Sequence, residues 1–177
     1  SDSLQSTDHN TEVLDIVGIG FGPSNIAIAI ALQENAADLS TIFLERRPSF
    51  AWHETMLFDT AMMQVNFLKD LASFRNPRSH FTFVNFLHYQ KRLADFTNLQ
   101  TLFPRRTEFR QYLSWCAHHF DDIVRYSTSA TSIETVLHDG VELFRIIAEG
   151  PDGAESFLAK IGRASCRERV YISVVGG

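Results

Sequence analysis

Runs of apolar residues divide the first quarter of the chain into predicted elements. Residues 12–20, EVLDIVGIG, are apolar and β-branched and end in glycines, so they predict a buried strand that runs into a turn. Residues 23–37 follow with helical spacing, and TIFLE at residues 41–45 predicts a second buried strand. The helix places four small or apolar residues on one face: Ile26, Ala27, Ile30 and Ala31. Strand, glycine turn, helix and strand form a βαβ unit, whose strands should be parallel.

Helical spacing returns in the middle of the chain after an irregular stretch. Residues 46–78 are rich in aromatics and methionine without a clear period, which predicts loops and short turns. Residues 81–93, FTFVNFLHYQKRL, are helical in spacing. A second helix should be capped by Thr107. Its apolar stripe consists of Phe109, Tyr112, Leu113, Cys116 and Phe120.

The last third alternates apolar and polar residues and contains two turn signals. Asp139-Gly140 separates two alternating runs, which is a hairpin signature, and a second turn falls at residues 150–153. We therefore expect a three-stranded antiparallel meander up to about residue 160. Together with the βαβ unit this predicts an α/β fold with a parallel core.

Composition limits the classes of function. A chain of 177 residues is enough for one domain, and its net charge of −5 argues against a nucleic-acid binder, which needs a basic face. The two cysteines, Cys116 and Cys166, have no spacing typical of zinc or of a disulfide framework, so we expect an intracellular, cytoplasmic protein. No apolar run reaches the roughly 18 residues of a membrane span. Residues 1–12 are polar and acidic, unlike a signal peptide, and predict a disordered lead-in.

The segment GIGFGPSN, residues 18–25, carries the strongest chemical signal. Gly18 and Gly20 match the first two positions of the G-x-G-x-x-G dinucleotide motif, between a predicted strand and helix. Gly18 should permit a tight turn, and Gly20 should let the backbone approach a pyrophosphate at the helix N-terminus. Pro23 stands at the third glycine position, where proline suits the first helical turn.

Glu45 closes the second predicted strand, about 25 residues after the glycine turn. An acidic residue at this place receives the ribose hydroxyls of an adenosine in dinucleotide-binding folds, and it favours FAD or NAD over NADP. The alternative is a solvated charge at a strand end, followed by Arg46 and Arg47.

Longer motifs carry a resemblance to a known family. The stretches WHETMLFDTAMMQVNFLKDLASFRNPRSHFTFVNFLH and RLADFTNLQTLFPRRTEFRQYLSWCAHHF, with GxGPSN before them, resemble the flavin-dependent L-ornithine N5-monooxygenases of siderophore biosynthesis. These are siblings of the L-lysine N6-hydroxylases. RNPRS and the spacing of RLxDFxNLxTxxPxRxEFxxYLxW favour the ornithine branch, while lysine stays the alternative substrate.

The resemblance implies a Rossmann-like FAD-binding domain over residues 13–160 and a set of site residues. The implied cofactor contacts are Gly18, Gly20, Gly22, Pro23, Ser24, Glu45, Arg46, Arg47, Pro48, Ser49, Phe50, Ala51, Trp52, His53, Gln64 and Ala130. Lys69, within MQxxFLKDL, matches the lysine that binds the amino-acid substrate. Ala130 departs from the larger aliphatic residue usual there, which a backbone contact to adenine tolerates. The resemblance implies no catalytic side chain and no metal ligand.

On composition alone these residues have plainer interpretations. Trp52 is more typical of a core or rim aromatic than of a flavin neighbour, while His53 fits a structural histidine as well as a site residue. Lys69 beside Asp70 is typical of a solvated surface pair. His118 and His119 fit a solvated helix end better than a metal site, because no carboxylate or cysteine partner has suitable spacing.

The family chemistry requires more than this chain contains. The resemblance implies that NADPH reduces FAD and that O2 supplies the oxygen atom added to the side-chain amine of L-ornithine, in a full-length protein that is a homo-oligomer. No second glycine-rich βαβ turn follows Asp121, so we expect an N-terminal fragment that is inactive alone. A related two-domain flavoprotein of other activity and a non-catalytic dinucleotide-binding module are the alternatives.

The sequence of residues 161–177 resembles translated adapter DNA. IGRASCRERV is the translation of ATC GGA AGA GCG TCG TGT AGG GAA AGA GTG, DNA that resembles a common sequencing-library adapter. The adapter continues into codons matching residues 172–175, while Tyr171 and Gly176 depart from it. The alternative is that VYISVVGG is a strand of the family itself. We expect residues 161–177 to be non-native.

Overall fold

A mixed β-sheet runs through the part of the chain that the computed structural model describes, residues 12–35, 38–52 and 61–164. Its strands are β1 (Val13–Ile19), β2 (Thr41–Leu44), β3 (Val124–Arg125), β4 (Ser129–His138), β5 (Val141–Gly150) and β6 (Gly153–Ala164). They lie in the order β3-β2-β1-β6-β5-β4. The pairs β3–β2, β2–β1 and β1–β6 are parallel, and the pairs β6–β5 and β5–β4 are antiparallel.

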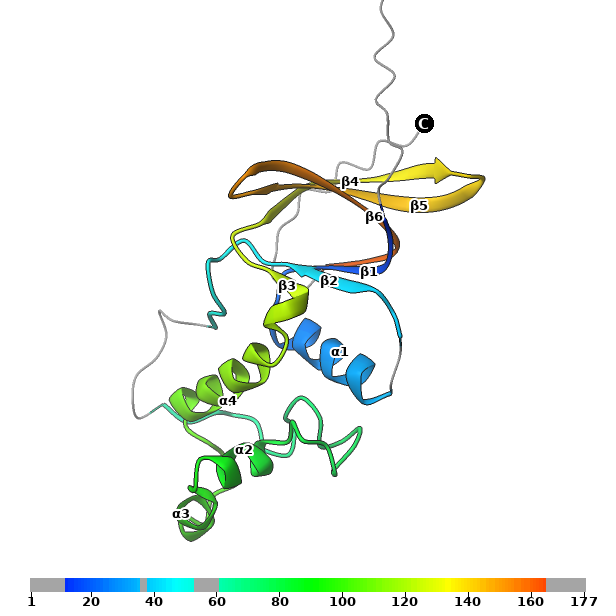
Figure 1. Cartoon of the computed structure of the whole chain (residues 1–177). Helices are drawn as coiled ribbons and strands as arrows, with labels where there is room; N and C mark the ends of the chain where they lie inside the picture. Colours follow the sequence, from blue (N-terminus) through cyan, green and yellow to red (C-terminus); the bar gives the residue numbers. More distant parts are fainter. Residues whose placement is uncertain (1–11, 36–37, 53–60, 165–177) are drawn as a thin grey trace, which may run out of the picture.

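The predicted βαβ unit is confirmed. β1 and β2 pair in parallel, and α1 (Pro23–Glu34) connects them on the side of the sheet that faces the other helices (Figure 1). The buried face of α1 differs from the prediction. It consists of Asn25, Ile26, Ala29 and Ile30, while Ala27 and Ala31 are only half-buried. Asn25 lies on this buried face, where its amide Nδ2 donates to carbonyls at the end of β1.

The helical segment predicted at residues 81–93 is two helices, α2 (Phe83–Tyr89) and α3 (Leu93–Asn98). The chain breaks between them at Lys91, whose φ of 58° is left-handed. Lys91 donates its N–H to the His88 carbonyl, and Arg92 donates to Leu87. This is the Schellman arrangement, with lysine where glycine is usual. The sequence did not indicate this helix end because lysine, and not glycine, occupies the left-handed position.

α4 (Arg106–His118) begins one residue before the predicted cap. Arg105 is its N-cap, no side chain caps it, and Thr107 lies within the first turn, so the capping prediction was wrong. Tyr112, Leu113 and Cys116 of the predicted stripe are buried, whereas Phe109 is half-buried. Phe120 is buried as well, although it lies just beyond the end of the helix. A short 3-10 helix, η2 (Asp121–Ile123), then leads into β3.

The predicted meander is confirmed, and the structure joins it to the parallel strands. Asp139 and Gly140 form the tight hairpin with φ angles of 49° and 78°. β6 then continues beside β1, with Val13 opposite Leu158, so meander and βαβ unit share one sheet. β6 extends to Ala164, and the expected domain boundary after Lys160 therefore falls inside a strand.

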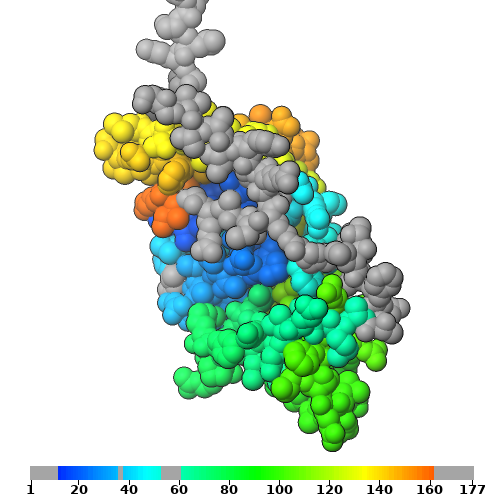
Figure 2. Space-filling view, turned by 180° about the vertical axis from the view of Figure 1, so that it is seen from behind, coloured from blue at the N-terminus to red at the C-terminus, as the bar shows by residue number. Residues whose placement is uncertain are grey.

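The sheet separates two hydrophobic cores. One core, on the meander side, consists of Val17, Leu44, Ile146, Ala148 and Ala159. The larger core contains α1, α2 and α4 with many aromatic rings, among them Phe21, Phe43 and Tyr112. Figure 1 shows the meander above the parallel strands and the helices below. In Figure 2, seen from behind, the yellow and orange residues lie toward one end and the green residues at the other.

Candidate functional site

Two glycines shape the carboxyl end of β1, for different physical reasons. Gly20 has a left-handed φ of 80°, and its N–H donates to the Leu44 carbonyl at 2.7 Å. Gly18 lies within β1 opposite Phe43, and an added Cβ would stand 2.3 Å from Cδ1 of that ring. The predicted tight turn is therefore made by Gly20, while Gly18 is required for space. Gly22 caps α1 with extended backbone, Pro23 follows at its first turn, and Ser24 is exposed.

Asn25 fixes this turn, a role that sequence reading missed. Its Nδ2 donates to the carbonyl of Gly20 at 2.6 Å and to that of Ile19 at 3.2 Å. The residue is fully buried. An asparagine among the apolar residues of a predicted buried helix face was the available signal, because a buried amide needs partners.

Glu45 is buried and bonded at the end of β2, so it is not a solvated charge. Its Oε2 accepts from the Phe21 N–H at 2.8 Å, and its Oε1 accepts from the Arg47 N–H at 3.0 Å. The residue remains 9% exposed. One carboxylate thus connects the glycine turn to the segment that follows β2.

The link between β3 and β4 runs beside Glu45. Ser127 donates its N–H to the Arg47 carbonyl at 2.9 Å, and Thr128 donates to the Glu45 carbonyl at 3.0 Å. Ala130 follows in β4, half-buried at an irregularity in the pairing with β5. The fold therefore brings the glycine turn, Glu45 and the start of β4 to one edge of the sheet.

Residues 46–52 leave this edge and reach α4. Arg46, Arg47, Pro48 and Ser49 are exposed, whereas Phe50, Ala51 and Trp52 are half-buried. The Arg47 guanidinium donates to the Ala51 carbonyl at 2.8 Å. The ring centroids of Trp52 and Phe109 are 6.0 Å apart. His53 lies outside the described residues.

Gln64 and Lys69 lie on a different segment, which runs beside residues 102–106. Met63 donates its N–H to the Pro104 carbonyl at 2.8 Å, and Phe67 donates to Leu102 at 2.9 Å. Gln64 and Lys69 are both exposed on this segment. Within the described residues, neither side chain forms a hydrogen bond or ion pair with the glycine turn.

Asp70 does not form a surface pair with Lys69. Its carboxylate accepts hydrogen bonds from the N–H groups of Ala72, Ser73 and Phe83 at 2.6 to 2.9 Å, and from the Ser73 hydroxyl. It thereby caps both the turn after Lys69 and the start of α2. Because the Asp70 carboxylate is occupied by these hydrogen bonds, it does not neutralise the exposed ammonium of Lys69, which is available to a ligand.

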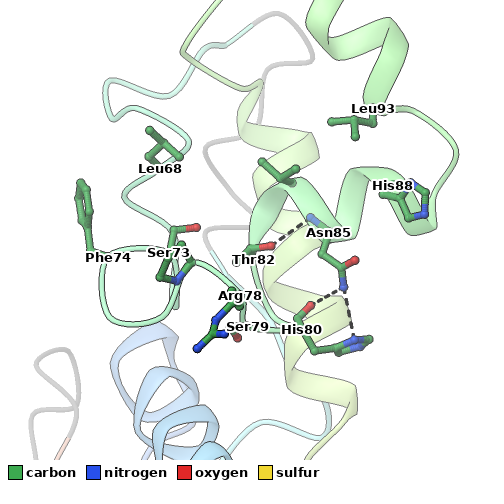
Figure 3. A pocket seen from close by; sticks show the side chains of 12 residues that line it. Leu68, Ser73, Phe74, Arg78, Ser79, His80, Thr82, Asn85, His88 and Leu93 are labelled. Atoms are coloured by element: carbon green, nitrogen blue, oxygen red, sulfur yellow. Dashed lines mark hydrogen bonds between the residues drawn. The ribbon is translucent and has the colours of Figure 1, made fainter.

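A groove of about 850 Å³ follows this turn (Figure 3). Leu68, Ser73 and Phe74 form one wall, and Thr82, Asn85 and His88 form the other. Asn85 bonds the hydroxyl of Thr82 through its N–H and the carbonyl of His80 through its side chain. Phe74 is 76% exposed at the rim of the groove.

Burial sets the protonation state of the side chains between α4 and the loops. Desolvation raises the pKa of Tyr112 and of Cys116 far above their usual range. Tyr112 donates to the Phe81 carbonyl at 2.7 Å and accepts from the Leu71 N–H at 3.1 Å. Burial and the nearby carboxylates of Asp121 and Glu45 raise the pKa of Tyr126 to about 12.

Among residues 12–35, 38–52 and 61–164, no group of three or more His, Cys, Asp or Glu side chains could hold a metal ion. Within the same ranges, none of the helices has the length and apolar character needed to cross a membrane.

These features define a dinucleotide-binding α/β domain. They are a parallel βαβ core with a glycine turn, a buried carboxylate at the end of the second strand, and a meander that continues the sheet. The sequence profile of the L-lysine 6-monooxygenase/L-ornithine 5-monooxygenase family matches residues 12–161. The chain belongs to this family.

Similar proteins include ornithine and lysine monooxygenases. The L-ornithine N(5)-monooxygenase of Pseudomonas aeruginosa is 48% identical over 147 residues, which cover 81% of this chain and 33% of the relative. The ornithine N-hydroxylase of Kutzneria sp. 744, solved with reduced FAD, NADP+ and L-ornithine, has a TM-score of 0.82 at 41% sequence identity. The match covers 86% of this chain and 37% of that structure. The L-lysine 6-monooxygenase from Pseudomonas syringae has a TM-score of 0.72 at 33% sequence identity. The match covers 86% of this chain and 37% of that structure. The chain spans about a third of the length of these proteins.

Proposed function

We propose that this chain is the N-terminal FAD-binding part of an NADPH- and O2-dependent monooxygenase that hydroxylates the side-chain amine of L-ornithine in siderophore biosynthesis. The observation that carries the FAD-binding part of the proposal is the Glu45 carboxylate, held by backbone N–H groups directly beside the left-handed Gly20 turn. This edge has the chemistry that an adenosine diphosphate moiety needs.

The residues at the edge fit FAD. A carboxylate can accept about four hydrogen bonds, and Glu45 uses one on each oxygen, which leaves capacity for a ribose diol. The first N–H groups of α1 have no intrahelical acceptor and favour an anion beside Gly20. FAD, when bound, supplies the redox chemistry. The chain orients it through Gly18, Gly20, Gly22, Pro23, Ser24 and Glu45, through residues 46–53, and through Gln64 and the backbone of Ala130.

Lys69 is the proposed substrate contact in this part of the protein. Its ammonium is exposed, and its neighbour Asp70 is turned into the fold. An ion pair with the carboxylate of an amino acid leaves the side-chain amine of that substrate free to reach the flavin. The higher identity to ornithine enzymes than to the lysine enzyme favours ornithine as that substrate.

We infer that the whole protein extends beyond this chain. The match covers a third of its relatives, and the Kutzneria enzyme was solved with NADP+ in addition to flavin. We infer that NADPH binds mainly outside this chain, that the chain does not complete turnover alone, and that the complete protein is a cytoplasmic homo-oligomer. The interpretation of residues 161–177 as non-native stays a prediction: the family match includes residue 161, and β6 continues to Ala164.

The test is amine-dependent oxygenation by a polypeptide that continues residues 12–160 to the full length of the family. Hydroxylated product should form from L-ornithine in preference to L-lysine. Lys69→Met should raise the KM for ornithine while leaving NADPH oxidation intact, whereas Lys91→Met, which removes an equivalent exposed charge, should change neither. Oxygenation that is independent of any amine would contradict the proposal. Turnover by the 177-residue chain alone would contradict its fragment status.

A non-catalytic dinucleotide-binding module is the alternative for this chain. The bonded state of Glu45 supports both ideas, but the exposed Lys69 within FLKDL favours the enzyme. Binding of FAD by the full-length protein without ornithine-dependent product would support the module.

A further inference from the structure

The backbone on both sides of Lys69 is held by two short polar side chains. Before it, Asn66 accepts the Leu68 N–H on its side-chain oxygen at 2.9 Å and the Lys69 N–H on its carbonyl oxygen at 2.9 Å. After it, the Asp70 carboxylate accepts the N–H groups two and three residues further on, at 2.9 and 2.6 Å. Asparagine and aspartate stabilise turns in this way. Lys69 therefore lies between two turns that each have their own side-chain acceptor.

Other parts of the fold hold the same segment from three directions. The Phe67 N–H donates to a carbonyl in the loop before α4 at 2.9 Å. The Leu71 N–H donates to the Tyr112 hydroxyl of α4 at 3.1 Å. The Oδ2 atom of Asp70 accepts the Phe83 N–H, at the start of α2, at 2.7 Å. The segment is thus fixed against two helices and one loop, while the Lys69 side chain stays exposed.

Asp70 is the anchor next to Lys69, and its hydrogen-bonding capacity is filled. Its Oδ1 accepts two backbone N–H groups, and its Oδ2 accepts the Phe83 N–H and the Ser73 hydroxyl, the latter at 2.6 Å. A carboxylate accepts about four hydrogen bonds in all. An asparagine of the same shape presents an NH2 group on one side, which cannot accept, so it cannot replace the carboxylate in this place.

We propose that Asp70 is a positioning residue for the substrate: it fixes the turn so that the Lys69 ammonium meets the carboxylate of the amino acid. The inference rests on the substrate contact proposed for Lys69. A lysine side chain is long and loses freedom when it forms an ion pair, and a fixed backbone limits that loss. Small displacements of a binding group are costly. Because Asp70 acts only through Lys69, its effect on the substrate should disappear when the ammonium is removed.

A double-mutant cycle in the full-length protein tests this dependence. The KM for L-ornithine is measured in the unmodified protein, in Asp70→Asn, in Lys69→Met and in the double variant. Asp70→Asn should raise the KM about threefold or more, as expected for neighbouring residues that couple, with little change in kcat. In the Lys69→Met background, Asp70→Asn should raise the KM no further.

Asp15→Asn is the matched control. The Asp15 carboxylate, on β1, also accepts hydrogen bonds in the fold, from the Ser40 N–H at 2.9 Å and from Lys160 at 2.8 Å. Its loss should lower the thermal unfolding midpoint and leave the KM unchanged, which is also the behaviour expected of Asp70 if its role were only structural.

Ser73→Ala replaces Asp70→Asn if that variant does not fold. It removes one of the four hydrogen bonds to the Asp70 carboxylate. It should raise the KM in the same direction, and again not in the Lys69→Met background.

Three results would overturn the inference: an unchanged KM in Asp70→Asn, an increase of the same size with and without Lys69, or an equal increase in Asp15→Asn. An unchanged KM in Lys69→Met would contradict the substrate role of Lys69 and this inference together. Absence of ornithine-dependent product from the unmodified full-length protein would instead contradict the proposed function.

Discussion

Gly18→Ala should destabilise the domain because there is no room for a methyl group. The added Cβ would stand 2.3 Å from Cδ1 and 2.6 Å from Cε1 of Phe43. The ring of Phe43 cannot move aside easily, since the residue is 1% exposed and its centroid is 5.1 Å from that of Phe21. The backbone of β1 or the ring must shift, and that shift moves the end of β1 that leads to Gly20.

The size of the effect follows from the cost of overpacking a core. Such insertions cost typically about 1–3 kcal/mol. For a protein of this length each kcal/mol lowers the unfolding midpoint by about 2–4 °C, so a drop of about 2–12 °C is expected. Thermal unfolding followed by far-UV circular dichroism measures the midpoint, and calorimetry measures the enthalpy.

Gly150→Ala is the matched control. A Cβ there would lie 3.5 Å from the Thr128 hydroxyl oxygen, which is an ordinary contact, and its midpoint should stay near that of the parent. Phe43→Leu should relieve part of the clash, so the double variant with Gly18→Ala should show a coupling of about 0.5–3 kcal/mol. A Gly18→Ala variant as stable as the Gly150→Ala control would refute the reasoning.

Three further predictions concern buried polar groups. Tyr112→Phe leaves a buried carbonyl and a half-buried N–H without their partner and should cost about 1–3 kcal/mol in urea unfolding. In a Cys166→Ser background, the Cys116 thiol should react with a disulfide reagent only on unfolding, because burial raises its pKa; fast reaction of native protein would contradict this. Burial opposes ionisation of Glu34, but hydrogen bonds and the Arg75 ion pair lower its pKa overall. Its contribution is therefore present above the unfolded-state pKa and lost as the pH falls through the folded-state value. The urea concentration at the unfolding midpoint should fall as the pH is lowered from about 6 to about 3, and it should fall less steeply in the Arg75→Gln variant. Equal pH dependence of the midpoint in the two proteins would contradict this.

Local patterns predicted the elements whose signals are contained within a few residues. The Asp139-Gly140 hairpin, the glycine turn and the strand ends of the βαβ unit were each readable in this way. The union of meander and parallel core was not, because Val13 pairs with Leu158 across most of the chain. The break at Lys91 was missed because a non-glycine residue occupies the left-handed position.

The candidate site divides along the same line. Gly20 and Glu45 were identified from motif spacing, and the structure places them at one edge. The reason for Gly18 was different from the predicted one, since the constraint comes from the Phe43 ring on a neighbouring strand. The roles of Asn25 and Asp70 depend on which backbone groups they meet after folding, and a sequence does not contain those distances.

Binding of FAD by this chain is the most direct test of the central claim that the Gly20–Glu45 edge receives the adenosine half of the cofactor. Quenching of flavin fluorescence should show saturable, weak binding of FAD that ADP-ribose displaces and riboflavin does not. Glu45→Gln should weaken it about tenfold or more, with an unchanged circular dichroism spectrum. Binding that riboflavin displaces as well as ADP-ribose does, or that Glu45→Gln leaves intact, would contradict the account.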